Sequence, residues 1–428
     1  MTIAAAPIPA EVVKRSTWRA VAAAAIGNAF EWYDFTVYVL FAPYIAATFF
    51  PGGTENEALL KAFLVFGVGF IARPLGGVLI GYFGDRVGRK AALTLTFGLM
   101  AVGTLMIAVT PGTASIGAAA GWFVVVGRLL QGLSAGGEIG GAASFLIEYA
   151  PPGRRAVFAA FLQASMAVSN ILAASMALAI GNFLSPEAVA AWGWRLPFFF
   201  GLLIVPVGLW LRASLDETPA FVAEQDTGQE APVLAVLRTQ GGPIARGFGL
   251  SVLWGVCTYA LIVYMPVHAQ KALGYSPDQA FAAALIGNVA LIGVCFVSGQ
   301  MADRFGRRTL LAGAALALAV ISPLVMAIAA AVHSFVSLLF AEVALCTLAG
   351  FYAGAMPATL AEMYPVRARA TSTSIAYNAA FTIFGGFAPA IITLLIAQGV
   401  GPQAPTLYVS AAAVISLVAL RGLRPAGT

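Results

Sequence analysis

The sequence predicts an all-α membrane protein whose twelve transmembrane helices form two pseudo-symmetric six-helix bundles. Three observations carry this prediction: a very apolar composition, twelve apolar runs of membrane-spanning length, and a charged motif that occurs twice. Apolar residues make up 60% of the 428 residues and charged residues 10%, whereas soluble domains contain about 45–50% and about 25% of these classes. A chain this apolar cannot bury all of its hydrophobic surface in a soluble core. We therefore expect the bilayer to surround most of the chain.

The apolar runs locate the individual spans, because a helix needs about 20 apolar residues to cross the bilayer. Residues 1–18 contain Lys14 and Arg15, and the run after them is too long for a cleaved signal peptide, so we expect it to be the first span. The expected spans lie near residues 20–48, 60–83, 91–110, 115–147, 156–182, 195–213, 245–269, 279–301, 309–331, 335–361, 370–397 and 403–421.

A polar stretch separates the two groups of six spans. Acidic residues and prolines gather in residues 214–243, which we interpret as a cytoplasmic linker. The expected domains are therefore a first bundle over residues 1–213, the linker over 214–243 and a second bundle over 244–428.

The motif G-x-x-x-D-R-x-G-R-[KR] occurs at residues 81–90 and again at 299–308. The two copies follow the second and the eighth expected span, which are equivalent points of the two halves. A second pair supports the repeat, because Glu148 ends the fourth span and Glu362 the tenth, each with arginines shortly after it. One membrane unit is thus used twice, a pattern typical of transporters.

The basic residues indicate the orientation in the membrane. With the N-terminus inside, most of the 23 Lys and Arg residues fall on the cytoplasmic side, while Lys61, Arg195 and Lys271 fall outside. This bias follows the positive-inside rule, so both termini are expected in the cytoplasm, with the chain in a bacterial-type inner membrane. The net charge of +5 therefore reflects topology and does not indicate a nucleic-acid partner.

Motifs for enzyme chemistry are absent from the sequence. Cys257, Cys295 and Cys346 are isolated, no metal-ligand spacing occurs, and no G-x-x-x-x-G-K-[ST] phosphate loop is present. Residues 132–136 match G-x-S-x-G, but they lie within an expected spanning helix, where a nucleophile elbow does not form. We therefore expect neither an enzyme nor a bound cofactor or metal, and a gradient as the energy source.

Four segments carry a family resemblance: GNAFEWYDF at 27–35, FIARPLGG at 70–77, GRLLQGLSAGGE at 127–138 and WGWRLPF at 192–198. With the doubled motif and the twelve spans, they resemble the major facilitator superfamily over essentially the whole chain. Within it they are similar to the metabolite:proton symporter branch, which includes carriers of citrate, α-ketoglutarate, shikimate and proline or betaine. The resemblance implies two six-helix bundles around a central cavity, alternating access and proton-coupled uptake.

Ionisable residues within the expected spans are the first functional candidates. Each costs about 2.5–3.5 kcal/mol to insert at the bilayer centre, so each must face a cavity or a partner. Glu31 and Asp34 lie one turn apart, where two ionised carboxylates repel, and we interpret one of them as the proton carrier. The alternative is a fixed ion pair with an arginine. The complete set is Glu31, Asp34, Arg73, Arg128, Glu138 and Glu342.

Arg128 and Gln131 share one face of the fourth span. A guanidinium stays charged and can hold a carboxylate through two parallel hydrogen bonds, so Arg128 is expected to bind substrate or to control the proton carrier. Its alternative is a structural pair with an acid of the first span. Arg73 precedes a proline that opens the helix, and substrate attraction and structural pairing fit it equally. Glu138 lies among glycines and Glu342 near the outer third of the tenth span, and packing explains each as well as transport.

Polar and aromatic side chains in the spans complete the candidate binding site. Each of them can instead form a hydrogen bond between helices. Besides Arg128, Gln131 and Arg73, the expected substrate contacts are Asn28, Tyr38, Gln163, Asn170, Tyr264, Tyr377 and Asn378.

The charged residues at the span ends are expected to act differently. By resemblance they form a conformational latch between the halves, and anchoring of the topology by positive charge is the alternative for the cations. The aspartates need a more specific explanation than anchoring. The set comprises Asp85, Arg86, Arg89, Asp303, Arg304, Arg307, Glu148 and Glu362.

The sequence thus favours a proton symporter that imports a small organic anion by alternating access, with a di- or tricarboxylate such as citrate or α-ketoglutarate as substrate. We expect a monomer whose partners are the substrate, the proton and the lipid bilayer. The main alternative is a proline or betaine symporter, because residues 259–266 resemble that subgroup, although the coiled coil of its osmosensing members does not follow the last span. An exporter of drugs or metallophores is less well supported, since the fifth span lacks the G-P-x-x-G-G pattern of drug antiporters.

Overall fold

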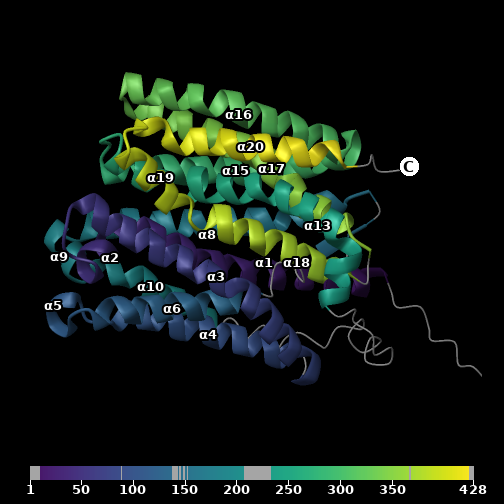
Figure 1. Ribbon diagram of the computed structural model, residues 1–428, viewed down its shortest axis with the longest axis horizontal. Coiled ribbons are helices and arrows are strands. Elements are labelled where there is room, and N and C mark those ends of the chain that lie inside the picture. Colours follow the sequence, from purple (N-terminus) through teal and green to yellow (C-terminus); the bar gives the residue numbers. More distant parts are fainter. Residues whose placement is uncertain are drawn as a thin grey trace, which may run out of the picture.

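The computed structural model describes residues 10–87, 89–136, 143, 146–147, 150–151, 153–206, 233–365 and 368–423. Throughout this part of the chain the structure is helical and contains no β-strand. Figure 1 shows the long helices side by side, with the N-terminal half on one side of the molecule and most of the C-terminal half on the other. The prediction of an all-α protein is confirmed.

The helices of the N-terminal half run alternately between the two ends of the molecule (Figure 1). Only Phe41 separates the first two helices, and the short turn η1 leads directly into α10, so each pair acts as one span. The elements are α1 (Ala10–Leu40), α2 (Ala42–Phe49), α3 (Glu55–Val87), α4 (Arg89–Val109), α5 (Thr113–Ile116), α6 (Ala119–Ala135), α8 (Arg155–Phe183), α9 (Pro186–Ala191), η1 (Gly193–Arg195) and α10 (Leu196–Gly201).

The C-terminal half has the same alternation, and two of its spans contain a π-helical segment. These segments, η2 and η4, interrupt the seventh and the eleventh span, and π-helical turns frequently occur at functional sites. The elements are α13 (Val233–Val256), η2 (Cys257–Val263), α14 (Met265–Lys271), α15 (Pro277–Phe305), α16 (Arg307–Val332), α17 (Phe335–Glu362), α18 (Arg369–Ala380), η4 (Phe381–Gly385), α19 (Ala388–Ala397), η5 (Gly401–Gln403) and α20 (Ala404–Arg421).

The helices occupy the predicted spans with shifted boundaries. In the described residues, 8 helices are long and apolar enough to cross a membrane, and shorter apolar helices cover Thr94–Val109, Ala119–Ala135 and Gly193–Pro206. With α1 they account for the twelve predicted spans. α3 begins earlier than predicted, because the acidic residues of its first turn complement the helix dipole. Residues 233–243 of the expected linker belong to α13, and 214–232 lie outside the described residues.

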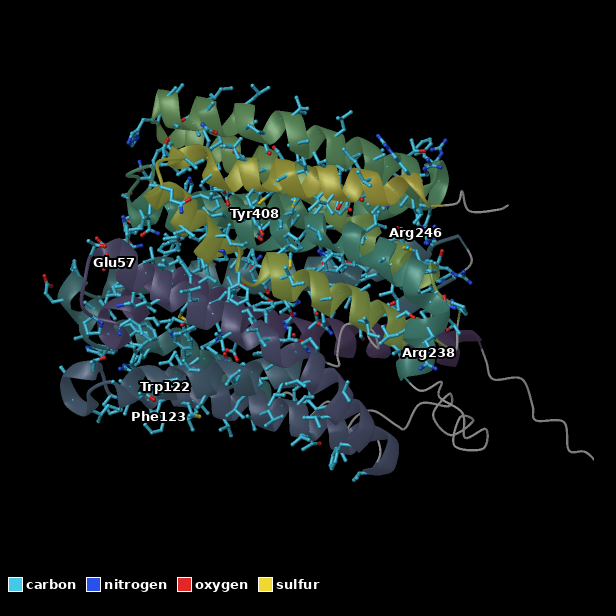
Figure 2. All side chains as sticks on the ribbon, viewed as in Figure 1. Glu57, Trp122, Phe123, Arg238, Arg246 and Tyr408 are labelled. Carbon is cyan, nitrogen blue, oxygen red and sulfur yellow. The ribbon has the colours of Figure 1, made fainter. Side chains whose placement is uncertain are left out.

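Large apolar side chains remain exposed on the outer helices. Trp122 is 69% and Phe123 48% exposed, and both lie on the outer side of α6 (Figure 2). Leu324 on α16 and Val418 on α20 are each 59% exposed. Large apolar side chains are exposed along most of the outer helices, a pattern that is rare in soluble proteins. These faces are suited to contact with lipid tails.

The two ends of the bundle carry different charged residues. We call the end with Arg238, Arg246 and Arg307 the arginine end, and the opposite end with Glu55 and Glu57 the far end. Figure 2 labels Arg238 and Arg246 at the first end and Glu57 at the second.

The two halves meet along a small number of helices. α8 packs along α15 and α17, α3 packs against α18, η4 and α19, and α1 touches η2 and α14. Helices that are far apart in the sequence therefore lie side by side along the centre of the molecule. We call this contact between the halves the seam, and the polar residues of α1, α3 and α6 lie on its N-terminal side.

Within the N-terminal half, Arg195 joins two spans through the WGWRLPF segment. Its Nη1 donates to the carbonyl oxygens of Ala108 at 2.7 Å and Ile107 at 3.3 Å, at the C-terminal end of α4. Its Cζ lies 4.4 Å from the centre of the Trp194 ring. A cation at a helix C-terminus satisfies free carbonyl groups and the helix dipole. The segment thus fixes the start of the sixth span against the end of the third.

Glycines allow α3 and α6 to approach closely. A Cβ on Gly132 would lie 1.8 Å from the carbonyl oxygen of Gly69, and one on Gly136 would lie 1.9 Å from that of Arg73. Small residues at a membrane helix interface permit such backbone contact. Gly132 and Gly136 therefore hold the helix that carries Arg128 against the helix that carries Arg73.

We expect Gly132→Ala to destabilise the protein by about 1–3 kcal/mol, the usual range for overpacking, or to prevent folding. The new methyl group cannot avoid the Gly69 carbonyl unless the two helices separate. Thermal unfolding of the protein in detergent measures the effect. Gly98→Ala on α4 is the matched control, since a Cβ there meets nothing within 4 Å. Equal unfolding temperatures for both variants would contradict the close contact.

Candidate functional site

Five of the predicted residues come together on three helices of the N-terminal half. α1 contributes Glu31 and Asp34, α3 contributes Arg73, and α6 contributes Arg128 and Gln131. Asp34, Arg128 and Gln131 are 0% exposed, and Arg73 is 1% exposed. Charged groups buried to this extent must be held by specific partners, and these partners decide what the site can do.

Arg73 and Glu31 form a direct ion pair. Arg73 Nη2 donates to Glu31 Oε1 at 3.1 Å, with both side chains almost fully buried. The guanidinium carbon also lies 4.6 Å from the centre of the Phe70 ring and 4.7 Å from that of Phe35. Such a pair, with aromatic faces against the cation, is strongly destabilised when one partner is removed. Glu31 thus has the fixed partner that one of the sequence hypotheses required.

Arg128 and Asp34 are joined through two intervening side chains. Arg128 Nη1 donates to Gln131 Oε1 at 2.6 Å. Gln131 Nε2 donates to Thr104 Oγ1 at 2.8 Å, and Thr104 Oγ1 donates to Asp34 Oδ2 at 2.5 Å. Every member of this chain is 0% exposed. The carboxylate and the guanidinium are therefore coupled by hydrogen bonds without direct contact.

One edge of the Arg128 guanidinium is unused. Within the described residues, its Nε and Nη2 have no hydrogen-bond partner, and neither does Asp34 Oδ1. The guanidinium carbon lies 4.6 Å from the centre of the Phe35 ring and 4.7 Å from those of Tyr38 and Phe66. These rings hold the cation in place but carry no negative charge to compensate it. Nε and Nη2 together form the two-donor edge that grips a carboxylate.

Two predicted contacts, Asn28 and Tyr38, connect neighbouring helices in this conformation. Asn28 Nδ2 donates to the Leu162 carbonyl oxygen at 3.0 Å and to Ser165 Oγ at 2.8 Å. The Tyr38 hydroxyl donates to the carbonyl oxygen of Ala62 at 3.1 Å.

Asn170 belongs to a polar contact between the halves. Thr36 Oγ1 donates to Asn170 Oδ1 at 2.6 Å, and Asn170 Nδ2 donates to Asn288 Oδ1 at 3.0 Å. Gln163, two turns earlier on α8, is 2% exposed, and its Nε2 has no hydrogen-bond partner in the described part of the chain. Through Asn170, α8 therefore contacts both α1 of its own half and α15 of the other half.

The candidates of the C-terminal half lie across the seam from the arginines. Asn378 Nδ2 donates to the carbonyl oxygen of Gly136 at 2.9 Å and so bridges the halves. The Tyr264 hydroxyl lies 3.4 Å from Thr393 Oγ1. Tyr377, beside Arg73, stacks on Phe381 with 3.9 Å between ring centres.

Aromatic rings fill the remaining space between the halves. The ring of Tyr259 lies 5.7 Å from that of Trp32, 5.5 Å from Phe66 and 5.2 Å from Phe70. Phe381 lies 6.4 Å from Trp32. Trp32 and Thr104 were missed as candidates by sequence reasoning. Thr104 lies in no motif, and Trp32, although it lies in the GNAFEWYDF segment, has no charge of the kind by which the other candidates were chosen.

The family follows from comparison with known proteins. Residues 24–389 match the Major Facilitator Superfamily. The chain belongs to the major facilitator superfamily.

Known relatives and solved structures agree with this assignment. A citrate-proton symporter of Klebsiella pneumoniae is 38% identical over 394 residues, which cover 92% of this chain and 88% of that protein. A proline/betaine transporter of Salmonella typhimurium is 31% identical over 415 residues, which cover 94% and 82%. The xylose transporter XylE from E. coli, in a partially occluded inward open conformation, has the same fold, with a TM-score of 0.77 and 18% identity over 96% of this chain and 99% of that chain.

As a member of the major facilitator superfamily, the chain is a multi-pass membrane transporter and not an enzyme. The predicted fold of two six-helix bundles is confirmed by the likeness to the xylose transporter. Among the residues that the structure describes, no group of three or more His, Cys, Asp and Glu side chains could hold a metal ion.

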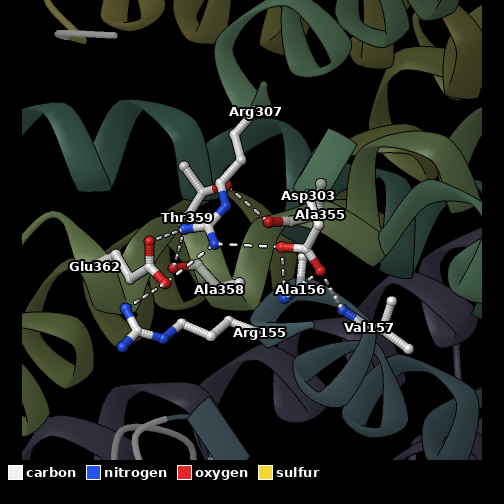
Figure 3. Close-up of polar contacts among 9 residues, drawn as sticks. All are labelled: Arg155, Ala156, Val157, Asp303, Arg307, Ala355, Ala358, Thr359 and Glu362. Carbon is white, nitrogen blue, oxygen red and sulfur yellow. Dashed lines mark hydrogen bonds and ion pairs between the residues drawn. The ribbon is translucent and has the colours of Figure 1, made fainter. Parts of the chain in front are cut away.

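At the arginine end of this major facilitator transporter, the second copy of the repeated motif joins the halves. The Asp303 carboxylate accepts hydrogen bonds from the backbone N–H groups of Ala156 at 3.1 Å and Val157 at 3.3 Å, in the first turn of α8 (Figure 3). Free N–H groups and the positive end of the helix dipole favour an anion at this position. An aspartate of the C-terminal half thus binds the start of a helix of the N-terminal half.

Glu362 extends the same network. Arg307 holds the Glu362 carboxylate through two hydrogen bonds, and Arg155 of α8 approaches it at 3.6 Å (Figure 3). Arg307 also lies 3.7 Å from Asp303. The predicted residues Asp303, Arg307 and Glu362 are therefore brought together, and Arg155 joins them unforeseen.

The remaining predicted latch residues either lie away from this network or fall outside the described residues. Arg304 contacts the ring of Phe305, with 5.1 Å from Cζ to the ring centre. The side chains of Asp85, Arg86 and Arg89 lie outside the described residues, as do Glu148 and Glu138. At the far end, Lys271 of α14 forms an ion pair with Glu55 of α3. Contacts between the halves thus exist at both ends, with the charged site enclosed between them.

Proposed function

We propose that this transporter is a proton-coupled symporter that imports a small organic anion by alternating access, and that its substrate is a di- or tricarboxylate such as citrate or α-ketoglutarate. The observation that carries the proposal is the unused two-donor edge of the buried Arg128 guanidinium, which is linked by hydrogen bonds to Asp34. The similarity to a citrate-proton symporter supports the same substrate class.

Asp34 is the proposed proton carrier. Glu31 already has a cation in contact, whereas Asp34 meets only a hydroxyl on one oxygen and, within the described part, no partner on the other. When Asp34 is ionised, its negative charge partly compensates Arg128, and a bound anion is held less tightly. When Asp34 is protonated, the charge of Arg128 is uncompensated and attracts a carboxylate. Proton and anion therefore favour each other's binding.

Thr104 and Gln131 transmit this coupling in the proposed mechanism. The Thr104 hydroxyl donates to Oδ2 of Asp34, and this hydrogen bond is stronger when Asp34 is ionised than when it is protonated. The change in strength acts on Gln131, which donates to the same hydroxyl and holds Arg128. Gln131 thus acts as a positioning residue in this conformation, where both ends of its amide have protein partners.

Thr104→Val should weaken coupling without emptying the space, because valine has nearly the shape of threonine and lacks the hydroxyl. We expect gradient-driven uptake to fall about 10-fold or more, since a hydrogen bond to a charged group contributes about 1.5–3 kcal/mol. Uptake as a function of pH in liposomes measures the change. Thr110→Val, directly after the last residue of α4, is the control, because the Thr110 hydroxyl donates to the Met106 carbonyl oxygen in the last turn of that helix. Similar losses in both variants would remove Thr104 from the mechanism.

In the proposed topology the protein lies in a bacterial-type inner membrane with both termini in the cytoplasm. By the positive-inside rule, the arginine end is then the cytoplasmic end. The two bundles, residues 1–213 and 244–428, move as units about the linker over 214–243, and one chain suffices for transport. The network of Asp303, Arg307 and Glu362 then acts as a latch that keeps the cytoplasmic end closed.

Asp303→Asn should shift the protein toward the conformation open at the arginine end. The carboxylate at the start of α8 contributes about 0.3–1 kcal/mol through the helix dipole alone, which corresponds to about a two- to fivefold shift in population. Labelling rates of a single cysteine placed at that end report the opening. Arg304→Gln is the control, since Arg304 contacts Phe305 of its own helix. Unchanged labelling in Asp303→Asn, or the same change in both, speaks against the latch.

A proline or betaine symporter is the second candidate. The rings of Trp32, Tyr259 and Phe381 at the seam could hold a quaternary ammonium group while Arg128 takes the carboxylate. The similarity to a proline/betaine transporter supports this reading.

Uptake into liposomes under an inward proton gradient tests the proposal. Labelled citrate, α-ketoglutarate, shikimate and proline are compared, with and without a protonophore. Accumulation of citrate or α-ketoglutarate that the protonophore abolishes is expected. Accumulation of proline alone favours the second candidate, and efflux of preloaded hydrophobic cations without uptake of any of the four would indicate an exporter.

A further inference from the structure

Glu342 is a buried carboxyl group that the mechanism above does not use. It lies on α17 in the C-terminal half, and only 2% of its surface is exposed. Its Oε1 has no hydrogen-bond partner among the described residues. The described ion pairs of the transporter leave it out as well.

Among the described residues, no cation forms an ion pair with Glu342. Its Cγ packs on Gly287 of α15, where an added Cβ would lie 2.9 Å from it and 3.1 Å from Cys346 Sγ. α8 and α16, which pack against α17, carry ionisable side chains only in their first turns at the arginine end. The titratable groups that the structure places beside Glu342 are the thiol of Cys346 and, next to it, that of Cys295. The charged residues of the other packed segments lie at the ends of their helices or at the arginine end: Asp278, Asp303, Arg304, Glu362, Arg369, Arg238 and Arg246.

A carboxylate in such a place is stable only as the neutral acid. Burial of an ionised group without a counter-ion or a hydrogen bond carries a large desolvation penalty, which protonation removes. The penalty disappears once water reaches the group. Whether Glu342 holds a proton therefore depends on whether the helices around it are together or apart.

The position of Glu342 connects it to the seam between the halves. Gly287, which contacts Glu342, is followed by Asn288, whose side chain meets Asn170 of α8 at 3.0 Å. α8 also packs along α17. Separation of α8 from α15 would break this amide contact and admit water next to Glu342. Glu342 lies in the half of α17 toward the far end, so opening at that end exposes it first.

We propose that Glu342 is a second proton-binding site, independent of Asp34, and that the transporter carries two protons in each cycle. Water at the open far end supplies a proton to the Glu342 carboxylate, the neutral acid is enclosed when that end closes, and the proton leaves to water when the arginine end opens. The proposal rests on proton-coupled symport as the function. To that function it adds a proton-binding group in the C-terminal half and a ratio of two protons for each transport cycle.

The number of protons per substrate tests the stoichiometry. In proteoliposomes, the membrane potential that just balances a fixed substrate and pH gradient gives this number directly. We expect two protons in the wild type and one in Glu342→Gln. Cys346→Ala, one turn away on the same helix, is the matched control and should retain two. One proton in the wild type, or the same number in the wild type and Glu342→Gln, overturns the proposal.

Infrared difference spectroscopy tests the proton itself without any substrate. A buried protonated carboxyl gives its own C=O stretching band, which should be present at neutral pH in the wild type and in Cys346→Ala and lost in Glu342→Gln. An unchanged band in Glu342→Gln overturns the assignment. Should Glu342→Gln fail to insert, Glu342→Asp must shift the same band, and an unshifted band has the same consequence. Absence of any gradient-driven uptake in the wild type would instead refute the proposed function and leave the infrared result to stand alone.

Discussion

Asp34→Asn is expected to abolish proton-driven accumulation of substrate while exchange of substrate across the membrane continues. Asparagine has the size of aspartate and resembles its protonated form, so Thr104 can still donate to the side-chain oxygen and the link to Arg128 remains. The charge of Arg128 stays uncompensated throughout the cycle, and the anion still binds. Because position 34 can no longer ionise and release the anion from Arg128, however, the cycle does not complete net uptake, even though Glu342 can still bind its proton.

Two measurements on reconstituted protein separate these outcomes. Uptake under an inward proton gradient should fall to the level of protein-free liposomes, whereas counterflow between labelled and unlabelled substrate should stay within a few-fold of the wild type. The exchange rate of Asp34→Asn should also lose the part of its pH dependence that comes from Asp34. Loss of both uptake and exchange would mean that Asp34 binds substrate or supports the structure and does not carry the proton.

Glu31→Gln is the control for the proton carrier, because Glu31 lies one turn from Asp34 and pairs with Arg73. Removal of this partner leaves a buried guanidinium uncompensated, which costs about 3–5 kcal/mol. We therefore expect lower thermal stability, with the pH dependence of the remaining transport retained. Uncoupled but rapid exchange in Glu31→Gln, together with intact accumulation in Asp34→Asn, would reverse the two assignments.

The fold could be predicted from the sequence because the bilayer imposes simple rules. Apolar runs of fixed length and the repeated motif at 81–90 and 299–308 are enough to derive spans and halves. The helix boundaries were harder to predict, because helices continue beyond the apolar runs into polar residues. α3 starts at Glu55, and α13 includes residues 233–243. Nothing in composition marks where such extensions end.

The membership of the candidate site was also predictable, but its pairing was not. The cost of burying charge singled out Glu31, Asp34, Arg73 and Arg128, and the structure brings all four together. Which acid meets which arginine depends on the rotation of α1 against α3 and α6, and a helical repeat leaves that angle open. Thr104, the link between Asp34 and Gln131, carries no charge and so gave no signal.

The proposed latch illustrates a different limit. The motif predicted that Asp303 and Arg307 act at the end of a span, yet the groups that Asp303 binds are the backbone N–H groups of Ala156 and Val157. Backbone partners have no identity in a sequence. Only the packing of α8 against α15 reveals that the first turn of α8, in the N-terminal half, is bound by a residue of the C-terminal half.

Arg128→Ala is expected to reduce binding of carboxylate substrates more than any other single change in the site. Loss of the guanidinium removes both donors of the two-donor edge and the only positive charge linked to Asp34 through Gln131 in the described residues. Truncation of one member of a buried charge pair costs about 2–5 kcal/mol, which corresponds to about a 30-fold to several thousand-fold loss of affinity. Equilibrium binding of labelled substrate to the purified protein measures it.

Arg128→Lys distinguishes charge from geometry at the same position. Lysine keeps the positive charge but offers a single point donor in place of the planar edge held between Phe35, Tyr38 and Phe66. We expect affinity to recover only in part, because one of two charged hydrogen bonds, at about 1.5–3 kcal/mol, stays lost. A neutral amide analogue of the substrate serves as the control ligand and should bind the wild type and both variants with similar, low affinity. If the substitutions weakened the carboxylate and its amide analogue equally, Arg128 would be a structural cation, and the anion would have to bind elsewhere along the seam.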